Sequence, residues 1–368
     1  MDTEVLVIGG GPAGLATSQQ LRRRGISHKV LERGDTVGHT WANLYDSLVL
    51  HTGKWMSSLP GLPFPRDYPT FVSRGDFLTY LRRYRDTFDL PVETGKDVER
   101  LEWTTHGWTA HVAGSQLRAR AIVMATGIVA NPVSPRFPGQ DQFRGRLLHS
   151  VEYRRPDPFR GQRVLVVGVG NSGGEIGSEL ARDGVPVTIA VRSGANVVPR
   201  ELFGVPIQYL AYYVRKLPRP AQRVVVSIIR QITRIRRGPP VLPPSPVFPL
   251  DAVPMIGFHL VDAIKSGAAQ VRPGLAALTP GGARFTDGRE EPFDTVILAT
   301  GFHAALRPLG PLVSADANGF ARRTDRVTSA DQAGLYFVGS NYDSGGGLHN
   351  IGVDAQLVAR RLSGRGSM

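Results

Sequence analysis

The stretch VLVIGGGPAGLA, residues 5–16, joins an apolar run to a glycine-rich turn. Its glycines follow the spacing G-x-G-x-x-G, in which the first permits a tight turn, the second lets a phosphate approach the backbone, and the third lets the next helix pack on the strand. The N-terminus of that helix presents free N–H groups and the positive end of its dipole to the phosphates. The stretch therefore predicts a Rossmann-like dinucleotide cradle. Its predicted contacts are Gly9, Gly11, Pro12, Ala13 and Gly14.

An acidic residue follows the predicted second strand of this unit. The strand lies in HKVLERG, residues 28–34, and Glu32 comes 23 residues after Gly9. A carboxylate at this distance accepts hydrogen bonds from ribose hydroxyl groups. We therefore expect the first cradle to hold a dinucleotide with an unphosphorylated ribose, and we expect Arg33 to be a further contact.

The same pattern occurs again in VLVVGVGNSGGEIG, residues 164–177. The glycine spacing repeats at Gly168, Gly170 and Gly173. The second strand of this unit ends in Arg192, 24 residues after the first glycine of the turn. Arg192 and Ser193 are suited to bind a 2′-phosphate, which an acid would repel. The second cradle is therefore predicted to select NADP(H), and an ordinary surface arginine is the alternative interpretation of Arg192.

Two cradles in one chain predict that two dinucleotides are held at once. We expect FAD in the first and NADPH in the second, so that a nicotinamide delivers hydride to a flavin that stays bound. The predicted fold class is α/β, with two three-layer Rossmann-like dinucleotide-binding domains and the NADPH domain inserted in a discontinuous FAD domain. The predicted boundaries are 1–159 and 292–368 for the FAD domain and 160–291 for the NADPH domain.

Two later apolar runs end in Ala-Thr-Gly, and each is interpreted as a crossover back to the first domain. The first run is expected to contact FAD and the second NADP. A strand, a glycine loop and a helix follow, and the N-terminus of this helix, near His349 and Asn350, is placed to stabilise charge on the flavin pyrimidine. The two Ala-Thr-Gly turns comprise Ala125, Thr126, Gly127, Ala299, Thr300 and Gly301.

The composition of the 368 residues excludes some function classes. The chain contains no cysteine, which removes disulfides, thiolate metal sites and redox thiols, and we expect no metal. No apolar run approaches the about 18 residues of a membrane span. The first strand leaves no room for a signal peptide before it, and we expect a cytoplasmic protein. The formal net charge of +13 is explained by the arginine content, and no nucleic-acid module is found.

The region 212–249 is the least regular part of the chain. Eight basic residues occur in it without an acid, and the stretch VVVSIIRQITRIRR, residues 224–237, has helical apolar spacing. A helix that lies on a membrane surface is one interpretation. The favoured prediction is a helix on the NADPH domain whose basic face points into water. The basic residues are Arg215, Lys216, Arg219, Arg223, Arg230, Arg234, Arg236 and Arg237.

The segment between the cradles points to a family. In FRGRLLHSVEY the residues Phe143, Gly145, His149 and Tyr153 match F-x-G-x-x-x-H-x-x-x-Y. This resembles the signature of class B flavin monooxygenases in the form carried by the flavin-containing monooxygenases, whereas Baeyer–Villiger enzymes usually end it in tryptophan. Further stretches resemble the YUCCA branch of that family. They include YDSLVLHTGKW, LPGLPFP, YPTFVSRGDFLTYL, VRSGANVVPRELFG, ILATGF and GLYFVG.

The resemblance implies an activity. In that family NADPH reduces FAD, oxygen adds to the flavin to give a C4a-(hydro)peroxide, and one oxygen atom passes to a small organic substrate. The implied substrate is a soft nitrogen or sulfur centre, or an aromatic 2-oxo acid that undergoes oxidative decarboxylation, as in YUCCA-like enzymes. The alternatives are a Baeyer–Villiger monooxygenase, an NADPH oxidase or flavin reductase that passes electrons to oxygen, a quinone or a protein, and a non-catalytic NADP(H) sensor.

The resemblance also implies roles for single residues. His51 falls where many relatives have an asparagine near the flavin peroxide, and a structural histidine is the alternative. Lys54 follows it as a flavin or NADP contact, and a solvated lysine is the alternative. Gly38 and Trp41 match a G-G-x-W motif in which His39 replaces the second glycine. His149 and Tyr153 are expected to fix the linker between the domains. Val98 is a further implied contact to FAD, and Asn171, Ser172 and Arg200 are further implied contacts to NADP. The catalytic candidates are His51, Lys54 and Asn171.

Overall fold

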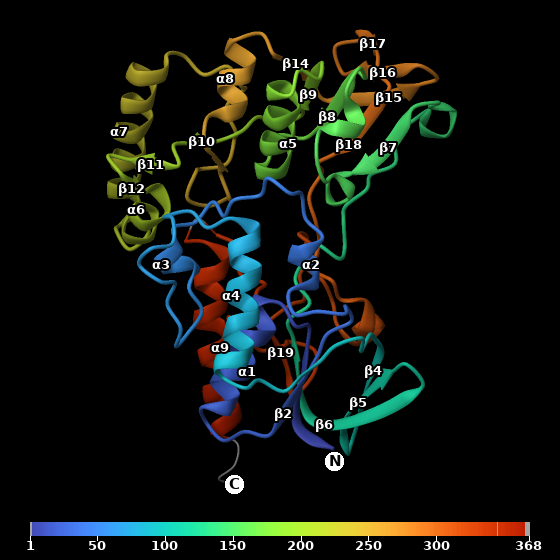
Figure 1. The fold of residues 1–368 in the computed structure, drawn as a ribbon, viewed down its shortest axis with the longest axis vertical. Helices are drawn as coiled ribbons and strands as arrows, with labels where there is room; N and C mark the ends of the chain where they lie inside the picture. Colours follow the sequence, from blue (N-terminus) through green and yellow to red (C-terminus); the bar gives the residue numbers. More distant parts are fainter. Residues whose placement is uncertain (1, 344, 365–368) are drawn as a thin grey trace. The chain divides into compact units, whose positions relative to one another are not determined.

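The chain forms two compact units in a computed structural model that describes residues 2–343 and 345–364. The first unit combines Met1–Asn43, Leu48–Asn131 and Phe302–Met368. The second combines Leu44–Ser47 and Pro132–Gly301. The second unit is thus inserted in the sequence of the first, as predicted for the two cradles. Each unit has its own sheet (Figure 1).

The first unit is built on a sheet with the order β3-β2-β1-β6-β5-β4, and β19 pairs with β6. The pairs β3–β2, β2–β1, β1–β6 and β6–β19 are parallel, whereas β4, β5 and β6 form an antiparallel meander. The strands are β1 (Thr3–Ile8), β2 (His28–Leu31), β3 (Val92–Glu93), β4 (Val98–Thr104), β5 (Gly107–Val112), β6 (Ser115–Met124) and β19 (Leu335–Phe337).

Alternation along β1 explains how this sheet is covered on both faces. Val5 and Val7 belong to the core on one side, and Leu6 and Ile8 belong to the core on the other. Successive side chains of a strand point to opposite faces of the sheet, so a strand whose side chains are all apolar must be covered on both faces. Helix α1 packs against α4 and α9 on the first of these sides (Figure 1). The helices are α1 (Pro12–Arg22), α2 (His39–Ala42), α3 (Lys54–Ser57), α4 (Arg74–Thr87) and α9 (Gly347–Ser363).

The second unit is built on an entirely parallel sheet with the order β14-β9-β8-β18-β7. Helix α5 packs against β8, β9 and α8. The antiparallel sheet β15-β16-β17 contributes to a core with β8 and β18. The elements are β7 (Arg146–His149), β8 (Val164–Val167), α5 (Asn171–Arg182), β9 (Val187–Val191), α8 (His259–Lys265), β14 (Ala269–Pro273), β15 (Leu275–Thr279), β16 (Gly282–Phe285), β17 (Glu290–Pro292) and β18 (Thr295–Leu298).

The boundaries of the second unit differ from the predicted 160 and 291. The unit begins at Pro132 and ends at Gly301, and it also takes in Leu44–Ser47. The difference arises because β7 and β18 flank each other in its parallel sheet, with Leu298 opposite His149. The strand before the second Ala-Thr-Gly turn is therefore part of the second sheet, and its interpretation as a crossover to the first domain was wrong.

The signature residues between the cradles hold the edge of the second sheet together. A Cβ on Gly145 would lie 2.5 Å from the carbonyl oxygen of Asp294 and 2.5 Å from Cζ of Phe143. The hydroxyl of Tyr153 donates to Glu179 on α5 at 2.9 Å, and its ring stacks on Phe159. The motif thus positions β7 beside β18 and ties the following turn to α5.

A region of short elements follows β9. It contains β10 (Val197–Val198), β11 (Glu201–Leu202), β12 (Val205–Pro206), α6 (Ile207–Val214), α7 (Arg219–Arg237) and β13 (Met255–Ile256). The predicted helix in the basic region is α7, which extends five residues further toward the N-terminus than the apolar stretch from 224. Short 3₁₀ helices lie at Gln140–Gln142 (η1), Ser150–Glu152 (η2), Asp157–Phe159 (η3) and Arg307–Leu312 (η4). Within the described ranges, every helix is too short or too polar to cross a membrane.

The close approach at Gly145 generates a testable prediction. Gly145→Ala would press a methyl group into a backbone carbonyl, so the free energy of unfolding should fall by about 1–3 kcal/mol. Gly281→Ala is the matched control, because a Cβ at Gly281 meets nothing within 4 Å among the described residues. Denaturant unfolding of both variants would measure the difference, and equal stabilities would contradict the packing role given to Gly145.

Candidate functional site

The first cradle has the close packing that its glycines predict. Gly9 has φ +111°, and a Cβ there would lie 2.6 Å from the carbonyl oxygen of Ala125. A Cβ on Gly14 would collide with the carbonyl oxygen of Gly9. Gly11 caps the N-terminus of α1, and a Cβ there would meet no described atom within 4 Å. The turn is therefore closed toward the sheet and open in front of the helix, where a pyrophosphate would lie.

Glu32 lies against this turn. Its carboxylate is buried and accepts hydrogen bonds from the backbone amides of Gly10 (2.6 Å) and Gly34 (2.8 Å). Two fixed N–H donors hold the carboxylate at the end of β2 and leave further lone pairs for ribose hydroxyl groups. The neighbouring Arg33 is exposed. These free acceptor positions fit the ribose hydroxyl groups of a bound dinucleotide, and the two hydrogen bonds from Gly10 and Gly34 explain why Glu32 is fixed beside the glycines.

Other predicted FAD contacts surround the same turn. The amide of Ala125 donates to Ile8, and the hydroxyl of Thr126 donates to the carbonyl of Ala305 at 2.8 Å. Gly127 has φ +64° and accepts a hydrogen bond from the amide of Ala305. The turn after β6 is thereby fixed beside the cradle, which fits its predicted role as part of the FAD site.

The loop that carries Gly38 and Trp41 is also joined to the cradle. Gly38 adopts a left-handed conformation, with φ +72°, and its amide donates to the carbonyl of Gly10 at 3.1 Å. Trp41 makes an edge contact with Phe77 of α4 at 4.6 Å between ring centroids. Val98 begins β4 and buries its side chain in the core, so only its backbone groups are suited to contact a cofactor.

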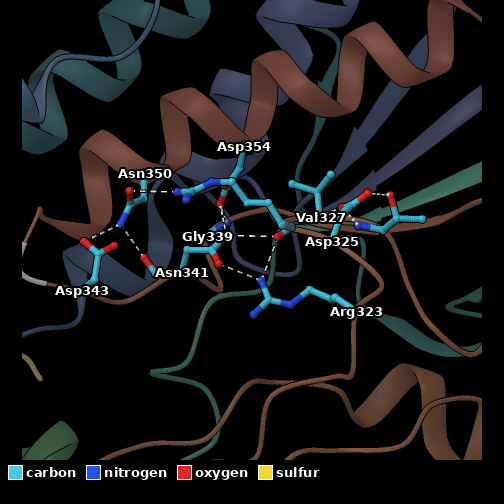
Figure 2. A network of polar contacts seen from close by, with 10 residues as sticks. Arg323, Asp325, Val327, Gly339, Asn341, Asp343, Asn350 and Asp354 are labelled. Carbon is cyan, nitrogen blue, oxygen red and sulfur yellow. Dashed lines mark hydrogen bonds and ion pairs between the residues drawn. The ribbon is translucent and has the colours of Figure 1, made fainter. Parts of the chain in front are cut away.

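A buried polar network fixes the first half of α9. Figure 2 shows Asn350 and Asp354 of this helix directed toward the segment around Gly339 and Asn341. Arg326 forms an ion pair with Asp354 and donates to Oδ1 of Asn350 at 2.8 Å. The Asn350 amide donates in turn to the Asn341 carbonyl (2.9 Å) and to Asp343 (3.1 Å). The side chain of Asn350 thus positions the helix.

The charge state of this network depends on burial. Asp354 is fully buried, and burial raises the pKa of its carboxyl, which the Asn341 amide and the Arg326 guanidinium oppose. A buried acid of this kind is stable only with its cation and its donors in place. Since Gly339 also donates to Asp354 and packs against Ala13, the network connects the start of α9 with the cradle helix α1. No local sequence motif predicts this network.

The structure places the two catalytic candidates of the first unit around α3. His51 is partly exposed and lies between Leu50, whose amide donates to Val72, and Gly53, the N-cap residue of α3. Helix α3 packs against α9, which carries His349 and Asn350. His51 therefore lies next to α3, which packs against α9, and this position fits its predicted role near the flavin.

Lys54 has a different environment from the one expected. Its ammonium group donates to the backbone carbonyls of Pro65 (3.3 Å), Arg66 (2.7 Å) and Tyr68. An ammonium group has three donors, so each of them has a backbone acceptor in the loop before α4. The geometry favours a structural role for Lys54, which differs from both sequence interpretations, a flavin or NADP contact and a solvated lysine.

The second cradle repeats the geometry of the first. Gly168 has φ +108°, and a Cβ there would collide with the carbonyl oxygen of Ala299. A Cβ on Gly173 would collide with the carbonyl oxygen of Gly168. Gly170 caps the N-terminus of α5, with open space in front of it among the described residues. The residues present fit a second pyrophosphate at the N-terminus of α5.

The second Ala-Thr-Gly turn closes this cradle. The amide of Ala299 donates to Val167 at 2.8 Å, and the hydroxyl of Thr300 donates to the carbonyl of Val133 at 2.5 Å. Gly301 accepts a hydrogen bond from the amide of Val133 at 2.9 Å. All three residues therefore lie at the carboxyl end of the second sheet, beside the second cradle, and their contact with NADP stays a prediction.

Asn171 is the first residue of α5, and its side chain forms hydrogen bonds with backbone groups of the protein. Its amide nitrogen donates to the carbonyl of Pro254 at 3.0 Å, and its Oδ1 accepts from the amide of Ile256 at 2.9 Å. Asn171 thereby holds the segment around β13 over the first turn of the helix, where Ser172 is partly exposed. The geometry favours a positioning role for Asn171, and the backbone of the first turn remains its predicted contribution to phosphate binding.

The predicted 2′-phosphate residues follow β9. Arg192 and Ser193 are both exposed, and they lie beyond the carboxyl end of the strand next to β8. Arg200 is partly buried, and burial lowers the pKa of its guanidinium, while Glu175 and Glu201 oppose this effect. Arg192 is the better placed of the two arginines for a phosphate at the end of β9, as in the sequence prediction.

Two tyrosines around α5 were not predicted as part of this site. Tyr45 is buried and donates to Glu175, and this carboxylate and burial raise the pKa of the tyrosine. Tyr153 donates to Glu179 one helical turn later, with the same effect on its pKa. The pairs join residues 130 and 26 positions apart, so no local motif reveals them.

His149 caps the turn after β7. It is buried, and its Nδ1 accepts from the amide of Val151, which places the proton of the neutral ring on Nε2. Burial lowers the pKa of His149, while the Gly301 carbonyl and Glu152 oppose this effect. The residue therefore links the signature to the second Ala-Thr-Gly turn, within the second unit. The expectation that it fixes the linker between the domains stays a prediction.

Together, two closed glycine turns, an acid after one and an arginine after the other define a flavoprotein that takes electrons from a nicotinamide dinucleotide. The chain belongs to the flavin-binding monooxygenase-like family, whose model matches residues 2–314. It is accordingly an NADPH-dependent flavin monooxygenase with FAD as its second cofactor, and the predicted family and cofactors are confirmed.

Similar proteins cover nearly the whole chain. Indole-3-pyruvate monooxygenase YUCCA1 of Oryza sativa subsp. japonica is 36% identical over 376 residues, which cover 97% of this chain and 90% of the relative. A flavin-containing monooxygenase from Stenotrophomonas maltophilia is similar in structure, with a TM-score of 0.80, 26% identity and 99% coverage of both chains. OTEMO, solved with FAD and NADP, shares the fold at a TM-score of 0.73 and 18% identity, over 98% of this chain and 85% of its own.

The placement of Arg192 predicts cofactor selectivity. Arg192→Ala should raise KM for NADPH roughly 10- to 150-fold, because a hydrogen bond to a charged group contributes about 1.5–3 kcal/mol. KM for NADH should change little. Steady-state kinetics with both nucleotides would measure this, and Arg144→Ala, which also removes an exposed arginine of the second unit, is the control. A wild-type enzyme that uses NADH as well as NADPH would show the assignment of Arg192 to be wrong.

Proposed function

We propose that the enzyme acts on an aromatic 2-oxo acid by oxidative decarboxylation. The observation that carries the proposal is the similarity, over nearly the whole chain, to relatives from rice and Arabidopsis thaliana named indole-3-pyruvate monooxygenases. In the reaction one oxygen atom of O₂ enters the substrate and the bond between its two carbonyl carbons breaks. The products are the shortened carboxylic acid, CO₂, water and NADP⁺, with NADPH and one proton supplying the two electrons and the hydrogens.

The proposed division of labour follows the two units. FAD belongs to the first, with the N-terminus of α1 against its pyrophosphate and Glu32 on its ribose. NADPH belongs to the second, with α5 at its pyrophosphate and Arg192 at its 2′-phosphate. When both are bound, the flavin supplies the redox and oxygen chemistry. The protein holds the nicotinamide and flavin, excludes water and provides hydrogen-bond donors where negative charge develops.

His51 is the proposed donor at the reacting edge of the flavin. A neutral imidazole has one N–H, so its tautomer decides whether it donates to an oxygen atom. His349 and the backbone at the N-terminus of α9 are proposed to face the flavin pyrimidine, since the positive end of a helix dipole stabilises negative charge. The ion pair between Arg326 and the buried Asp354 supports this arrangement, because it anchors the same helix.

We place the reaction in the cytoplasm, where NADPH is kept reduced, with a small-molecule substrate and O₂ as the partners of catalysis. The stoichiometry of the products and the fate of the oxygen atoms test the proposed reaction. The FAD-loaded enzyme is mixed with NADPH and indole-3-pyruvate or phenylpyruvate under ¹⁸O₂, and the acid product, CO₂ and NADPH consumption are measured. One equivalent of each per NADPH is expected, with one ¹⁸O atom in the new carboxylate and the other in water.

The matched comparisons in this experiment are a tertiary amine, a thioether and a cyclic ketone. Faster coupled turnover of one of these compounds would assign a soft-centre or a Baeyer–Villiger monooxygenase instead. Hydrogen peroxide formed in equal amount to the NADPH consumed, with every substrate, would assign an NADPH oxidase.

The role of His51 has its own test. His51→Ala should leave reduction of the flavin by NADPH nearly unchanged, since hydride transfer precedes the reaction with oxygen. Loss of one donor in a water-poor site costs roughly 2–4 kcal/mol, so the release of hydrogen peroxide per NADPH consumed should rise toward one. Peroxide and NADPH are measured with a true substrate present. His106→Ala, in an exposed turn of the first unit, is the control. A peroxide ratio equal to that of the wild type would show that His51 is structural.

A further inference from the structure

Helix α7 exposes most of its surface. Of its 19 residues, Gln222 and Val226 are buried, and the helix joins a small core with Val214 of α6 and Leu250. Figure 1 shows α7 at one edge of the second unit. The helix therefore uses one narrow face for packing, and its other faces are free to meet something else.

The exposed side of α7 carries an apolar stripe. Val224 is 59% exposed, Ile228 53% and Ile235 75%. Residues that are four and eleven positions after Val224 fall within about 40° of it around a helix of 3.6 residues per turn. These three side chains thus follow one side of the helix over three turns, with the exposed Gln231 between Ile228 and Ile235, opposite the buried face that contains Val226. Branched aliphatic side chains held in water along a line mark an interaction surface.

The same helix has a strongly positive edge. Between Glu201 and Asp251 the sequence contains eight basic residues and no acidic one. Arg219 pairs with Asp251 and Arg237 with Asp262, at the two ends of the helix. Within the described part of the chain, Arg223 and Arg234 have neither an ion pair nor a side-chain hydrogen bond. Both are exposed and lie one position from Val224 and Ile235, so cationic groups line the apolar stripe.

Residues just before α7 also combine exposed apolar groups with positive charge. Tyr213 at the end of α6 is 66% exposed, and Leu217 in the turn before α7 is 41% exposed. The ammonium of Lys216 lies 4.2 Å from the ring centroid of Tyr212. Tyrosine, with an apolar ring and a polar tip, and lysine, with an apolar stem and a charged head, both suit the boundary between water and hydrocarbon.

We propose that α7 docks the enzyme on an anionic membrane surface, with Val224, Ile228 and Ile235 inserted among the lipids and the arginines on their phosphates. Charge complementarity selects this occupant, because a bilayer of acidic lipids offers both negative charge and an apolar layer along the whole helix. The sequence prediction placed the basic face of this helix in water, and in the structure the apolar residues Val224, Ile228 and Ile235 are exposed as well. The helix lies on the surface and does not span it.

Vesicle sedimentation tests the proposal. The FAD-loaded full-length enzyme is mixed with vesicles of phosphatidylcholine alone, or with about one third phosphatidylglycerol, and the bound fraction is measured at low and high NaCl. Sedimentation with the anionic vesicles only, reversed by salt, is expected. Arg223→Gln with Arg234→Gln should lower the partition coefficient about 30-fold, since each basic residue near such a surface contributes ~1 kcal/mol.

A second variant tests the apolar stripe. Val224→Ser, Ile228→Ser and Ile235→Ser together should lower the partition coefficient at least tenfold at unchanged net charge. The flavin absorbance and the rate of flavin reduction by NADPH should stay at wild-type values, which shows that the variants are folded. Arg82→Gln with Arg83→Gln, two exposed arginines of α4, is the matched charge control and should bind like the wild type.

Three outcomes would overturn the proposal. The first is a lack of sedimentation with anionic vesicles. The second is an equal loss of binding in the α4 control, which would indicate diffuse attraction by net charge. The third is a self-association of the wild type, measured by light scattering, that the serine variant abolishes while vesicle binding is absent in both, which would make a second copy of the chain the occupant of the stripe.

Discussion

The close contact between each glycine turn and the strand that returns beside it is the constraint on which both units depend. In the first unit Gly9 lies against the carbonyl of Ala125, and in the second Gly168 lies against the carbonyl of Ala299. In both units, the third glycine of the motif lets the following helix pack closely against the carbonyl group of the first glycine. A side chain at any of these points would push the helix N-terminus away from the sheet. The phosphate site of each unit is therefore a consequence of how its backbone packs.

Much of this arrangement could be predicted, because the decisive features are local in the sequence. The two cradles, the acid at Glu32 and the arginine at 192 each follow from spacing within one strand-turn-helix-strand unit. The domain boundaries could not be predicted as well, because a parallel strand gives no local sign of which sheet it joins. The pairing of β18 with β7 and β8 depends on residues more than 100 positions apart.

The candidate site shows the same limit at the level of side chains. The motif placed Lys54 and Asn171 near the cofactors, but their hydrogen bonds go to Tyr68 and Ile256, backbone partners that only the folded chain brings close. The pair of Arg326 with the buried Asp354 could not be predicted for the same reason, since nothing in either local sequence indicates that the two residues meet. For α7 the apolar period predicted a helix, but periodicity cannot tell how much of its circumference is covered.

The dependence of the first unit on α9 has a consequence for biosynthesis. Helix α1 packs against α9, and Ala355, Val358 and Leu362 complete the core around Leu15 and Leu21. A ribosome adds roughly 5–20 residues per second, so the apolar face of α1 waits some tens of seconds for its partner. The second unit, which ends at Gly301, is synthesised in full during that interval. The amino-terminal part of the first unit, up to Asn131, therefore exposes apolar surface that favours aggregation until α9 has been synthesised.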